Sequence, residues 1–171
     1  EAHIPDSVSI TALRAGFGSK LAWLVEPGQV VVLVGRDDED ARAAAALAES
    51  VGITRLAGFL AGGMTSWREE RRPVERIERI DVPQLRERAD GLQILDVREL
   101  DEWDSAHIPG SVHLPYHDIH GVPEGIDPER PVAVICSSGQ RAAPAASLLR
   151  RHGVREVLHV AGERLDRAST G

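Results

Sequence analysis

Cysteine is almost absent from this sequence, and long apolar runs are absent altogether. Among 171 residues Cys136 is the only cysteine, so the chain cannot form an internal disulfide, and we expect it in a reducing compartment, the cytoplasm. The longest apolar runs, Val30–Val34 and Ala43–Ala48, are too short to cross a bilayer, and the first residues lack the pattern of a signal peptide. We therefore predict a cytoplasmic protein that has no membrane partner.

Basic residues and cofactor motifs are also scarce. The 20 Lys and Arg residues against 27 Asp and Glu residues leave a net charge of -7, which argues against a nucleic-acid partner. No glycine-rich phosphate loop, dinucleotide fingerprint or Gly-x-Ser-x-Gly elbow occurs, and no cofactor is predicted. Four histidines surround Pro115, but proline breaks any helix that would bring them onto one face, and no metal is predicted. They are His107, His113, His117 and His120, of which His117 and His120 are candidates to line a substrate entrance.

An internal repeat organises the chain. Residues 2–8 (AHIPDSV) recur as residues 106–112 (AHIPGSV), which predicts two related modules. The charged segment 70–79, broken by Pro73, separates them, so we predict domains at 1–74 and 75–171. Because residues 80–105 precede the motif in the second module only, we expect the first module to be incomplete at its N-terminus and the chain to be part of a longer one. An uncovered sheet edge in that module would offer a surface for a homodimer.

Short apolar runs alternate with amphipathic stretches in the second module. That pattern predicts an α/β fold of two modules, each a parallel sheet flanked by helices. Trp23, Trp67 and Trp103 lie within apolar or amphipathic stretches and are predicted to anchor the cores. In the second module, strands are predicted at 93–97, 111–115, 132–135 and 156–160 and helices at 99–105 and 141–152; in the first, a strand at 30–34 and a helix at 41–51.

The second module contains a loop that could carry out chemistry. Cys136 ends a buried strand, and the polar loop after it leads into a helix. Backbone N–H groups of such a loop, together with the helix N-terminus, form an anion site that favours a thiolate, which is a nucleophile. From the residues alone, the alternative is a small apolar cysteine that closes the strand. The candidate anion-binding residues are Ser137, Ser138, Gly139, Gln140 and Arg141.

Four motifs, in this order, resemble those of rhodanese domains. They are residues 96–98 (DVR), 102–103 (EW), 106–111 (AHIPGS) and 136–141 (CSSGQR). The resemblance covers nearly all of residues 78–171, and residues 1–74 resemble the later part of the same fold, including residues 62–67 (GGMTSW). It implies a sulfurtransferase in which Cys136 takes sulfane sulfur from a small donor, holds it as a persulfide and passes it to a thiol acceptor. By the same resemblance Asp96 and Arg98 support the site, although we expect a structural ion pair.

Details of the motifs refine this expectation. Related cysteine phosphatases have one more residue between the cysteine and the arginine, so the shorter loop from Cys136 to Arg141 favours sulfur over phosphate. Two-domain thiosulfate enzymes usually place basic residues directly after the cysteine, whereas Ser137 and Ser138 are neutral, and we expect thiosulfate to be a poor donor. Residues 162–166 lack the Gly-Gly-Met and Trp that end the first module, so the last helix is expected to be loosely packed or truncated.

The first module is predicted to be catalytically inactive. Aligning Val30–Val34 with Val132–Ile135 places Gly35 opposite Cys136, followed by acidic residues 37–40 that complement the helix dipole and repel anions. We expect it to bind no persulfide, phosphate or sulfate. The whole arrangement resembles the C-terminal region of bacterial fusion proteins in which a metallo-β-lactamase-fold hydrolase or persulfide dioxygenase precedes two rhodanese modules, which would make an N-terminal metallo-hydrolase domain a partner. The alternative is a non-catalytic persulfide-binding or regulatory module.

Overall fold

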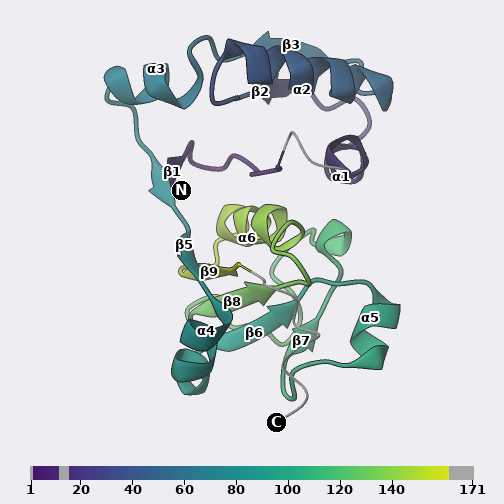
Figure 1. The fold of residues 1–171 in the computed structure, drawn as a ribbon, viewed down its shortest axis with the longest axis vertical. Helices are drawn as coiled ribbons and strands as arrows, with labels where there is room; N and C mark the ends of the chain where they lie inside the picture. The colour runs from purple at the N-terminus through teal and green to yellow at the C-terminus, as the bar shows by residue number, and fades with distance from the viewer. Residues whose placement is uncertain (1, 12–15, 162–171) are drawn as a thin grey trace. The chain divides into compact units, whose positions relative to one another are not determined.

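The computed structural model describes residues 2–11 and 16–161, and the chain divides into two compact units (Figure 1). One, here called the Cys136 unit, comprises Glu1–Ala2, Asp6–Ser9 and Arg76–Gly171. The other, the Gly35 unit, comprises His3–Pro5 and Ile10–Glu75. The main division along the chain lies between Glu75 and Arg76, and two short stretches among residues 1–9 belong to the Cys136 unit.

The Cys136 unit is built around one parallel sheet. Its five strands lie in the order β5-β9-β8-β6-β7, and every neighbouring pair is parallel. Figure 1 shows α6 over one face of this sheet and α4 under the other, which confirms the predicted α/β class. The elements are β5 (Glu78–Ile80), α4 (Val82–Arg88), η1 (Ala89–Gly91), β6 (Gln93–Asp96), α5 (Leu100–Ser105), β7 (Val112–His113), η2 (Tyr116–Asp118), β8 (Val132–Ile135), α6 (Ala142–Arg151) and β9 (Val157–Val160).

The sequence pattern located most of these elements closely. The predicted strand 132–135 coincides with β8, whose four residues are all buried, as a central strand covered on both faces requires. Leu85 on α4 packs with Ile135 and Leu158 in the core under the sheet. The segment 70–79, predicted to be only a boundary, contains β4 (Glu75–Arg76) and the beginning of β5. Residues 162–166, where a loosely packed or truncated helix was expected, lie outside the described residues.

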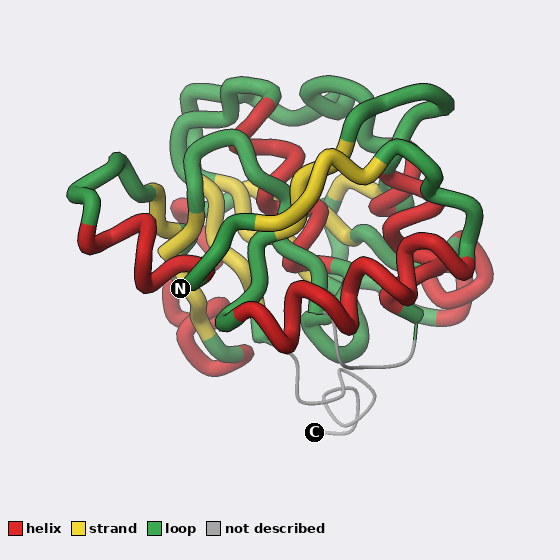
Figure 2. Tube along the Cα trace, turned by 90° about the horizontal axis from the view of Figure 1, so that it is seen from above, coloured by secondary structure: helices red, strands yellow, loops and turns green. Residues whose placement is uncertain are grey.

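The Gly35 unit has a smaller sheet, in which β2 (Val31–Leu33) and β3 (Leu56–Phe59) pair in parallel. Its helices are α1 (Phe17–Leu24), α2 (Asp38–Ser50) and α3 (Gly63–Glu69); β1 (Ala2–His3) pairs with β4. Apolar side chains of α1 and α2 form its core. Among the described residues β2 has a partner along one edge only, and Val32 is 61% exposed, unlike any residue of β8. Figure 2 colours the helices red and the strands yellow along the trace of the chain.

Two predictions about these units need correction. The helix expected to begin at Ala41 begins at Asp38, because the side chain of Asp37 accepts the backbone N–H of Asp40 at 2.9 Å and caps the helix. The prediction that tryptophans anchor the cores was wrong for Trp23, which is 62% exposed, since Phe17 and Leu21 of the same helix face the interior instead. Trp67 and Trp103 are half-buried. Of the helices described, none is long and apolar enough to span a membrane.

Candidate active site

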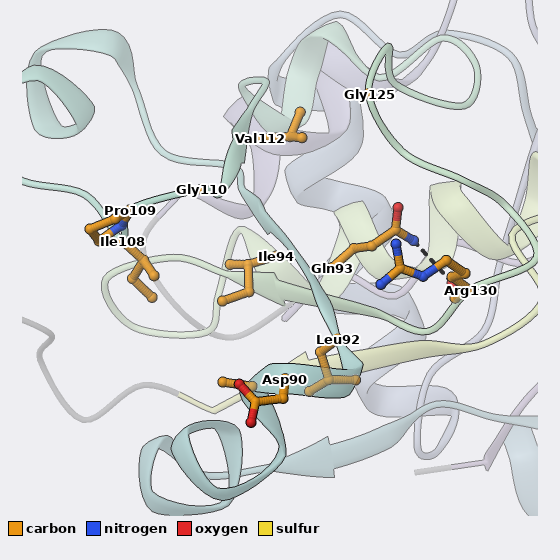
Figure 3. A pocket seen from close by; sticks show the side chains of 11 residues that line it. Asp90, Leu92, Gln93, Ile94, Ile108, Pro109, Gly110, Val112, Gly125 and Arg130 are labelled. Atoms are coloured by element: carbon orange, nitrogen blue, oxygen red, sulfur yellow. Dashed lines mark hydrogen bonds between the residues drawn. The ribbon is translucent and has the colours of Figure 1, made fainter.

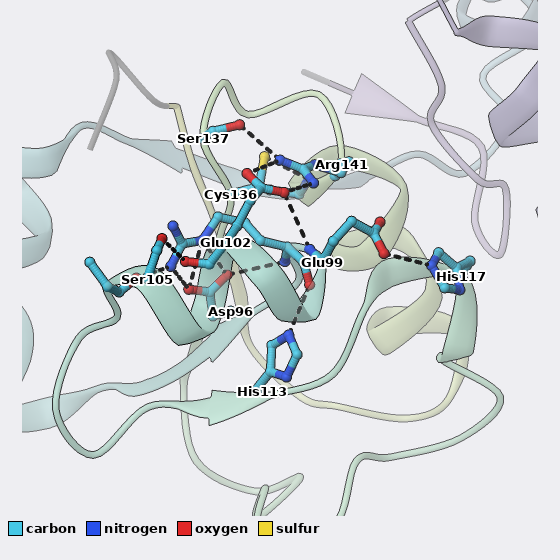
Figure 4. A network of polar contacts seen from close by, with 12 residues as sticks. Asp96, Glu99, Glu102, Ser105, His113, His117, Cys136, Ser137 and Arg141 are labelled. Atoms are coloured by element: carbon cyan, nitrogen blue, oxygen red, sulfur yellow. Dashed lines mark hydrogen bonds and ion pairs between the residues drawn. The ribbon is translucent and has the colours of Figure 1, made fainter. Parts of the chain in front are cut away.

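Cys136 lies at the carboxyl end of β8, between the ends of β9 and β6. The carboxyl ends of strands are where open parallel sheets place their ligand sites, because the strand-to-helix loops gather there. Residues 137–141 form the loop that joins β8 to α6. Figure 4 shows Cys136 in a network of polar side chains that come from this loop, from α5 and from η2. Position alone therefore makes this loop the leading candidate for a functional site.

The first amide of α6 faces the cysteine sulfur. The backbone N–H of Ala142 donates to the Sγ of Cys136 at 3.4 Å. The side chain of the N-cap residue, Arg141, does not cap this helix. The N–H of Ala142 is directed at the sulfur, and the N–H of Ala143 donates to the carbonyl of Gly139. Because a helix N-terminus carries a partial positive charge, this arrangement stabilises negative charge on the sulfur. Cys136 itself is only 1% exposed.

Arg141 places a second positive group beside the sulfur. Its Nη2 donates to Ser137 Oγ and to Glu102 Oε1, both at 2.8 Å, and its Nη1 donates to the other oxygen of Glu102. The hydrogen bond with Glu102 holds the pKa of Arg141 above its ordinary value, and the charge of the Cys136 sulfur adds to that shift. Conversely, the hydrogen bond with Arg141 lowers the pKa of Glu102. The guanidinium is thus oriented over the loop by a carboxylate from α5.

A histidine joins the outer part of this network. His117 approaches Glu99 Oε2 at 3.2 Å through Nε2 and Asp118 Oδ1 at 3.0 Å through Nδ1. Burial lowers the pKa of His117, but the hydrogen bonds with the two carboxylates outweigh burial, and its pKa lies above the ordinary value. The backbone N–H of Glu99 donates to Glu102, which connects His117 to the Arg141 pair. Of the two histidines proposed for a substrate entrance, His117 lies in this network and His120 is exposed.

Asp96 and Arg98 form a buried ion pair. The guanidinium Nη2 of Arg98 lies 2.6 Å from a carboxylate oxygen of Asp96, whose side chain is fully buried. The same Nη2 donates to the carbonyl of Ala106 at 2.7 Å. This pair connects the end of β6 to the segment after α5, because Arg98 also donates to the Ala106 carbonyl. It thereby holds the backbone next to α5, the helix that carries Glu102.

The remaining predicted residues occupy the loop in different ways. Ser137 is half-buried and bonded to Arg141, and Ser138 is exposed at the surface of the loop. Gly139 is buried with φ +78°, a left-handed conformation that favours glycine. Gln140 is half-buried. Within residues 2–11 and 16–161, no group of three or more His, Cys, Asp and Glu side chains is arranged to hold a metal ion.

A separate hollow of about 440 Å³ opens at the other end of the sheet (Figure 3). It includes Leu92, Ile94 and Ile108 and the charged residues Asp90 and Arg130. No residue of the Cys136 loop lines it. The hollow therefore does not belong to the site around the cysteine.

The corresponding loop of the Gly35 unit is filled by its own backbone and carboxylates. A Cβ atom at Gly35 would lie 2.6 Å from the carbonyl oxygen of Asp37, so this position has no room for a cysteine side chain. Arg36 pairs with Asp40, and the side chain of Asp38 accepts the backbone N–H of Gly62 at 2.7 Å. No nucleophilic side chain occupies the position equivalent to Cys136.

The sequence is similar to rhodanese-like domains and to sulfurtransferases. The sequence profile of the Rhodanese-like domain matches residues 1–70 and 81–163. Thiosulfate sulfurtransferase GlpE of Pseudomonas syringae is 36% identical over 75 residues, which are 44% of this chain and 71% of that protein. The candidate sulfur carrier protein YrkF of Bacillus subtilis is 37% identical over 71 residues, 42% of this chain but only 38% of that protein. A human single-domain sulfurtransferase superimposes on 56% of this chain and 99% of its own, with 20% identity and a TM-score of 0.48.

Proposed function

The chain belongs to the rhodanese-like domain family, and from that membership we propose that its Cys136 unit is a sulfurtransferase. In this proposal Cys136 accepts sulfane sulfur from a small donor, holds it as a persulfide and passes it to a thiol. The observation that carries the proposal is the position of the sulfur, which receives the first N–H of α6 beside the Arg141 guanidinium. Such a setting stabilises both a thiolate nucleophile and a persulfide anion.

The proposed reaction has two displacement steps. The thiolate of Cys136 attacks the outer sulfur of the donor, and an S–S bond forms as the donor's own bond to that sulfur breaks. The electron pair leaves with the donor fragment, which departs as a thiolate from an alkyl persulfide or as sulfite from thiosulfate. An acceptor thiolate then attacks the same sulfur and releases the Cys136 thiolate. Sulfur and charge balance without an external oxidant or reductant.

Each neighbouring group has a defined task in this scheme. The N–H of Ala142 and the Arg141 guanidinium stabilise the charge on sulfur in both steps, while Glu102 and Ser137 fix the direction of the guanidinium. Because the thiol must remain reduced to attack, we also propose a reducing compartment, the cytoplasm. The small exposure of Cys136 favours donors whose terminal sulfur is slender enough to enter the loop.

Intact mass spectrometry tests the proposal directly. The purified chain is incubated separately with thiosulfate, 3-mercaptopyruvate and glutathione persulfide and then weighed beside Cys136→Ser. We expect a gain of about 32 Da, one sulfur atom, on the parent chain and none on the variant. Because Cys136 is the only cysteine, a gain on both chains would exclude a cysteine persulfide as its cause. No gain with any donor would refute persulfide formation on this chain.

A non-catalytic persulfide-binding or regulatory module is the second candidate. The observation in its favour is that Cys136 is 1% exposed, since burial hinders an acceptor from reaching a stored sulfur. The two candidates differ in turnover. A persulfide that forms and then stays on Cys136 in excess thiol favours the module, whereas repeated release of sulfur favours the sulfurtransferase.

A fusion partner is the third part of the proposal. We propose that Cys136 exchanges sulfur with a metallo-hydrolase domain of the same polypeptide, as the tandem arrangement of the two units suggests by resemblance. In a full-length protein that contains such a domain, Cys136→Ser should impair the handling of persulfide substrates. Unchanged activity of that variant would contradict the exchange.

A further inference from the structure

His159 contacts the Cys136 loop from the neighbouring strand. It lies on β9, directly opposite Val134 of β8 in the parallel register. Side chains alternate along a strand, so His159 projects to the face opposite the core residues Leu158 and Val160. Its Nε2 lies 2.9 Å from the carbonyl oxygen of Gly139. A side chain outside the loop thus holds the loop at its left-handed glycine.

The Gly139 carbonyl has two hydrogen-bond partners, and together they fix one peptide of the loop. It accepts from His159 and from the backbone N–H of Ala143, at 3.2 Å, in the first turn of α6. Because a trans peptide is planar, the N–H of Gln140 must point away from the carbonyl of Gly139. With the carbonyl held toward His159, that amide is directed to the other side of the peptide.

The chemistry of the contact defines the ring's tautomer. A carbonyl only accepts, so the ring must carry a proton on Nε2. Burial, the largest influence, lowers the pKa of His159; the Gly139 hydrogen bond raises it and Arg79 lowers it further, leaving the pKa below its ordinary value. The ring is therefore neutral near pH 7, with Nδ1 unprotonated. Protonation in acid would leave the Nε2 donor in place.

The Gly35 unit lacks both the cysteine and the histidine that contacts its loop. In its sheet Leu33 pairs with Phe59, as Val134 pairs with His159, so Phe59 occupies the position of His159. Phenylalanine has no hydrogen-bond donor, and its ring lies under the Arg42 guanidinium instead. The unit without the cysteine is therefore also the unit without the donor, which links His159 to the cysteine's chemistry rather than to the fold.

We infer that His159 is a positioning residue for the Cys136 loop: its hydrogen bond holds the Gly139 carbonyl, which also receives the Ala143 N–H, and so keeps the start of α6, with the Ala142 N–H, at the sulfur. This inference rests on the proposed function. His159 acts through Gly139 and touches neither donor nor acceptor. Its removal should slow sulfur transfer by relaxing the loop, while the sheet and α6 stay folded.

Two variants at this position separate the donor from the bulk of the ring. His159→Gln keeps an N–H near the position of Nε2, whereas His159→Leu keeps volume and loses the donor. We expect about a tenfold loss in the rate of persulfide formation for His159→Leu, the effect of one lost hydrogen bond, and a loss within about threefold for His159→Gln. Thermal melting of both variants reports the fold. Equal rates for wild type and His159→Leu, or equal losses in the two variants, would overturn the inference.

A measurement on the parent chain tests the contact without any sulfur chemistry. Two-bond ¹H–¹⁵N correlation spectra of the histidine rings report which nitrogen carries the proton. We expect the Nε2–H tautomer for His159, and an Nδ1–H tautomer would contradict the hydrogen bond. If the parent chain gains no sulfur from any donor while this tautomer is present, the proposed function fails and the contact stands. If sulfur is gained and the tautomer is absent, only the role of His159 fails.

Discussion

In each of the two units a short loop joins a parallel strand to a helix, and the first amides of that helix have different partners. In the Gly35 unit the carboxylate of Asp37 caps α2. In the Cys136 unit no side chain caps α6, and the N–H of Ala142 donates to the cysteine sulfur. The comparison shows that one strand-loop-helix design can direct the start of its helix at a capping carboxylate or at a cysteine sulfur.

The strongest test tries to transfer the chemistry to the other unit. In a Cys136→Ser background, Gly35→Cys places a thiol at the equivalent strand end. We expect no sulfur gain with donors that load the parent chain. The added side chain has no room beside the Asp37 carbonyl, and acidic residues surround the start of α2, so neither a thiolate nor a persulfide is stabilised. Intact mass spectrometry with the same donors provides the measurement.

Folding must be checked in that experiment. A cysteine at this position should cost about 1–3 kcal/mol of stability, the usual range for overpacking, so circular dichroism must first show folded protein. If the variant is unfolded, the donors are tested again under stabilising solutes. A gain of about 32 Da on folded protein would mean that the loop of the Gly35 unit can bind a persulfide after all.

A smaller but pH-dependent effect is expected from Glu102→Gln. The variant should lower stability at pH 7 by about 1–3 kcal/mol and slow sulfur transfer, because Arg141 loses its charged partner. The pKa of Glu102 is lowered in the folded chain by Arg141, so its contribution is fully present above the carboxyl's ordinary pKa and is lost as pH falls through the folded value. Urea unfolding of both proteins between pH 7 and about pH 3 measures this difference.

The chain offers a matched control for this carboxylate. Glu129 pairs with Arg155 through side chains that are 72% and 77% exposed, so Glu129→Gln should change stability by well under about 1 kcal/mol. A stability difference between wild type and Glu102→Gln that stayed constant from neutral to acidic pH would show that the carboxylate's charge is not what holds Arg141.

The sequence predicted those parts of the site that are local. Cys136, the loop and Arg141 lie within six consecutive positions between a buried strand and a helix, and that local pattern alone predicts a strand, an anion-binding turn and a helix. The whole of β8 was predicted for the same reason, because an uninterrupted apolar run indicates a central strand. Local chemistry and local geometry coincide here.

Partners from distant positions could not be found in this way. Glu102 lies 39 residues from Arg141, and its pairing depends on α5 packing beside the loop. His159 lies 20 residues from Gly139, and their contact requires β9 next to β8. The correspondence of His159 to Phe59 likewise follows from the registers of the two sheets. Trp23 failed as a predicted core residue because hydrophobicity alone does not show which face of a short helix is covered.

Charge at Ser138 should alter donor preference by a moderate factor. Ser138 is exposed on the loop, and neither it nor Ser137 carries charge. We expect Ser138→Lys to raise kcat/KM for thiosulfate, a dianion, by about fivefold at low salt, with a smaller gain for a monoanionic alkyl persulfide. The gain should shrink as salt screens the lysine. Ser138→Gln is the neutral control of similar length, and an equal gain in that variant would assign the effect to size.

The smallest expected effect comes from removing the Asp37 cap of α2. Asp37→Ala removes the acceptor for the Asp40 N–H, and losing such a cap typically costs about 1 kcal/mol. Asp37→Asn keeps an acceptor oxygen and removes the charge, so it should retain most of the stability measured by urea unfolding. If a bound anion can replace the Asp37 carboxylate at the start of α2, sulfate should also stabilise Asp37→Ala more than it stabilises the parent chain. Equal sulfate responses would show that the remaining carboxylates of residues 38–40 still exclude an anion, and that the two units differ by more than a cap.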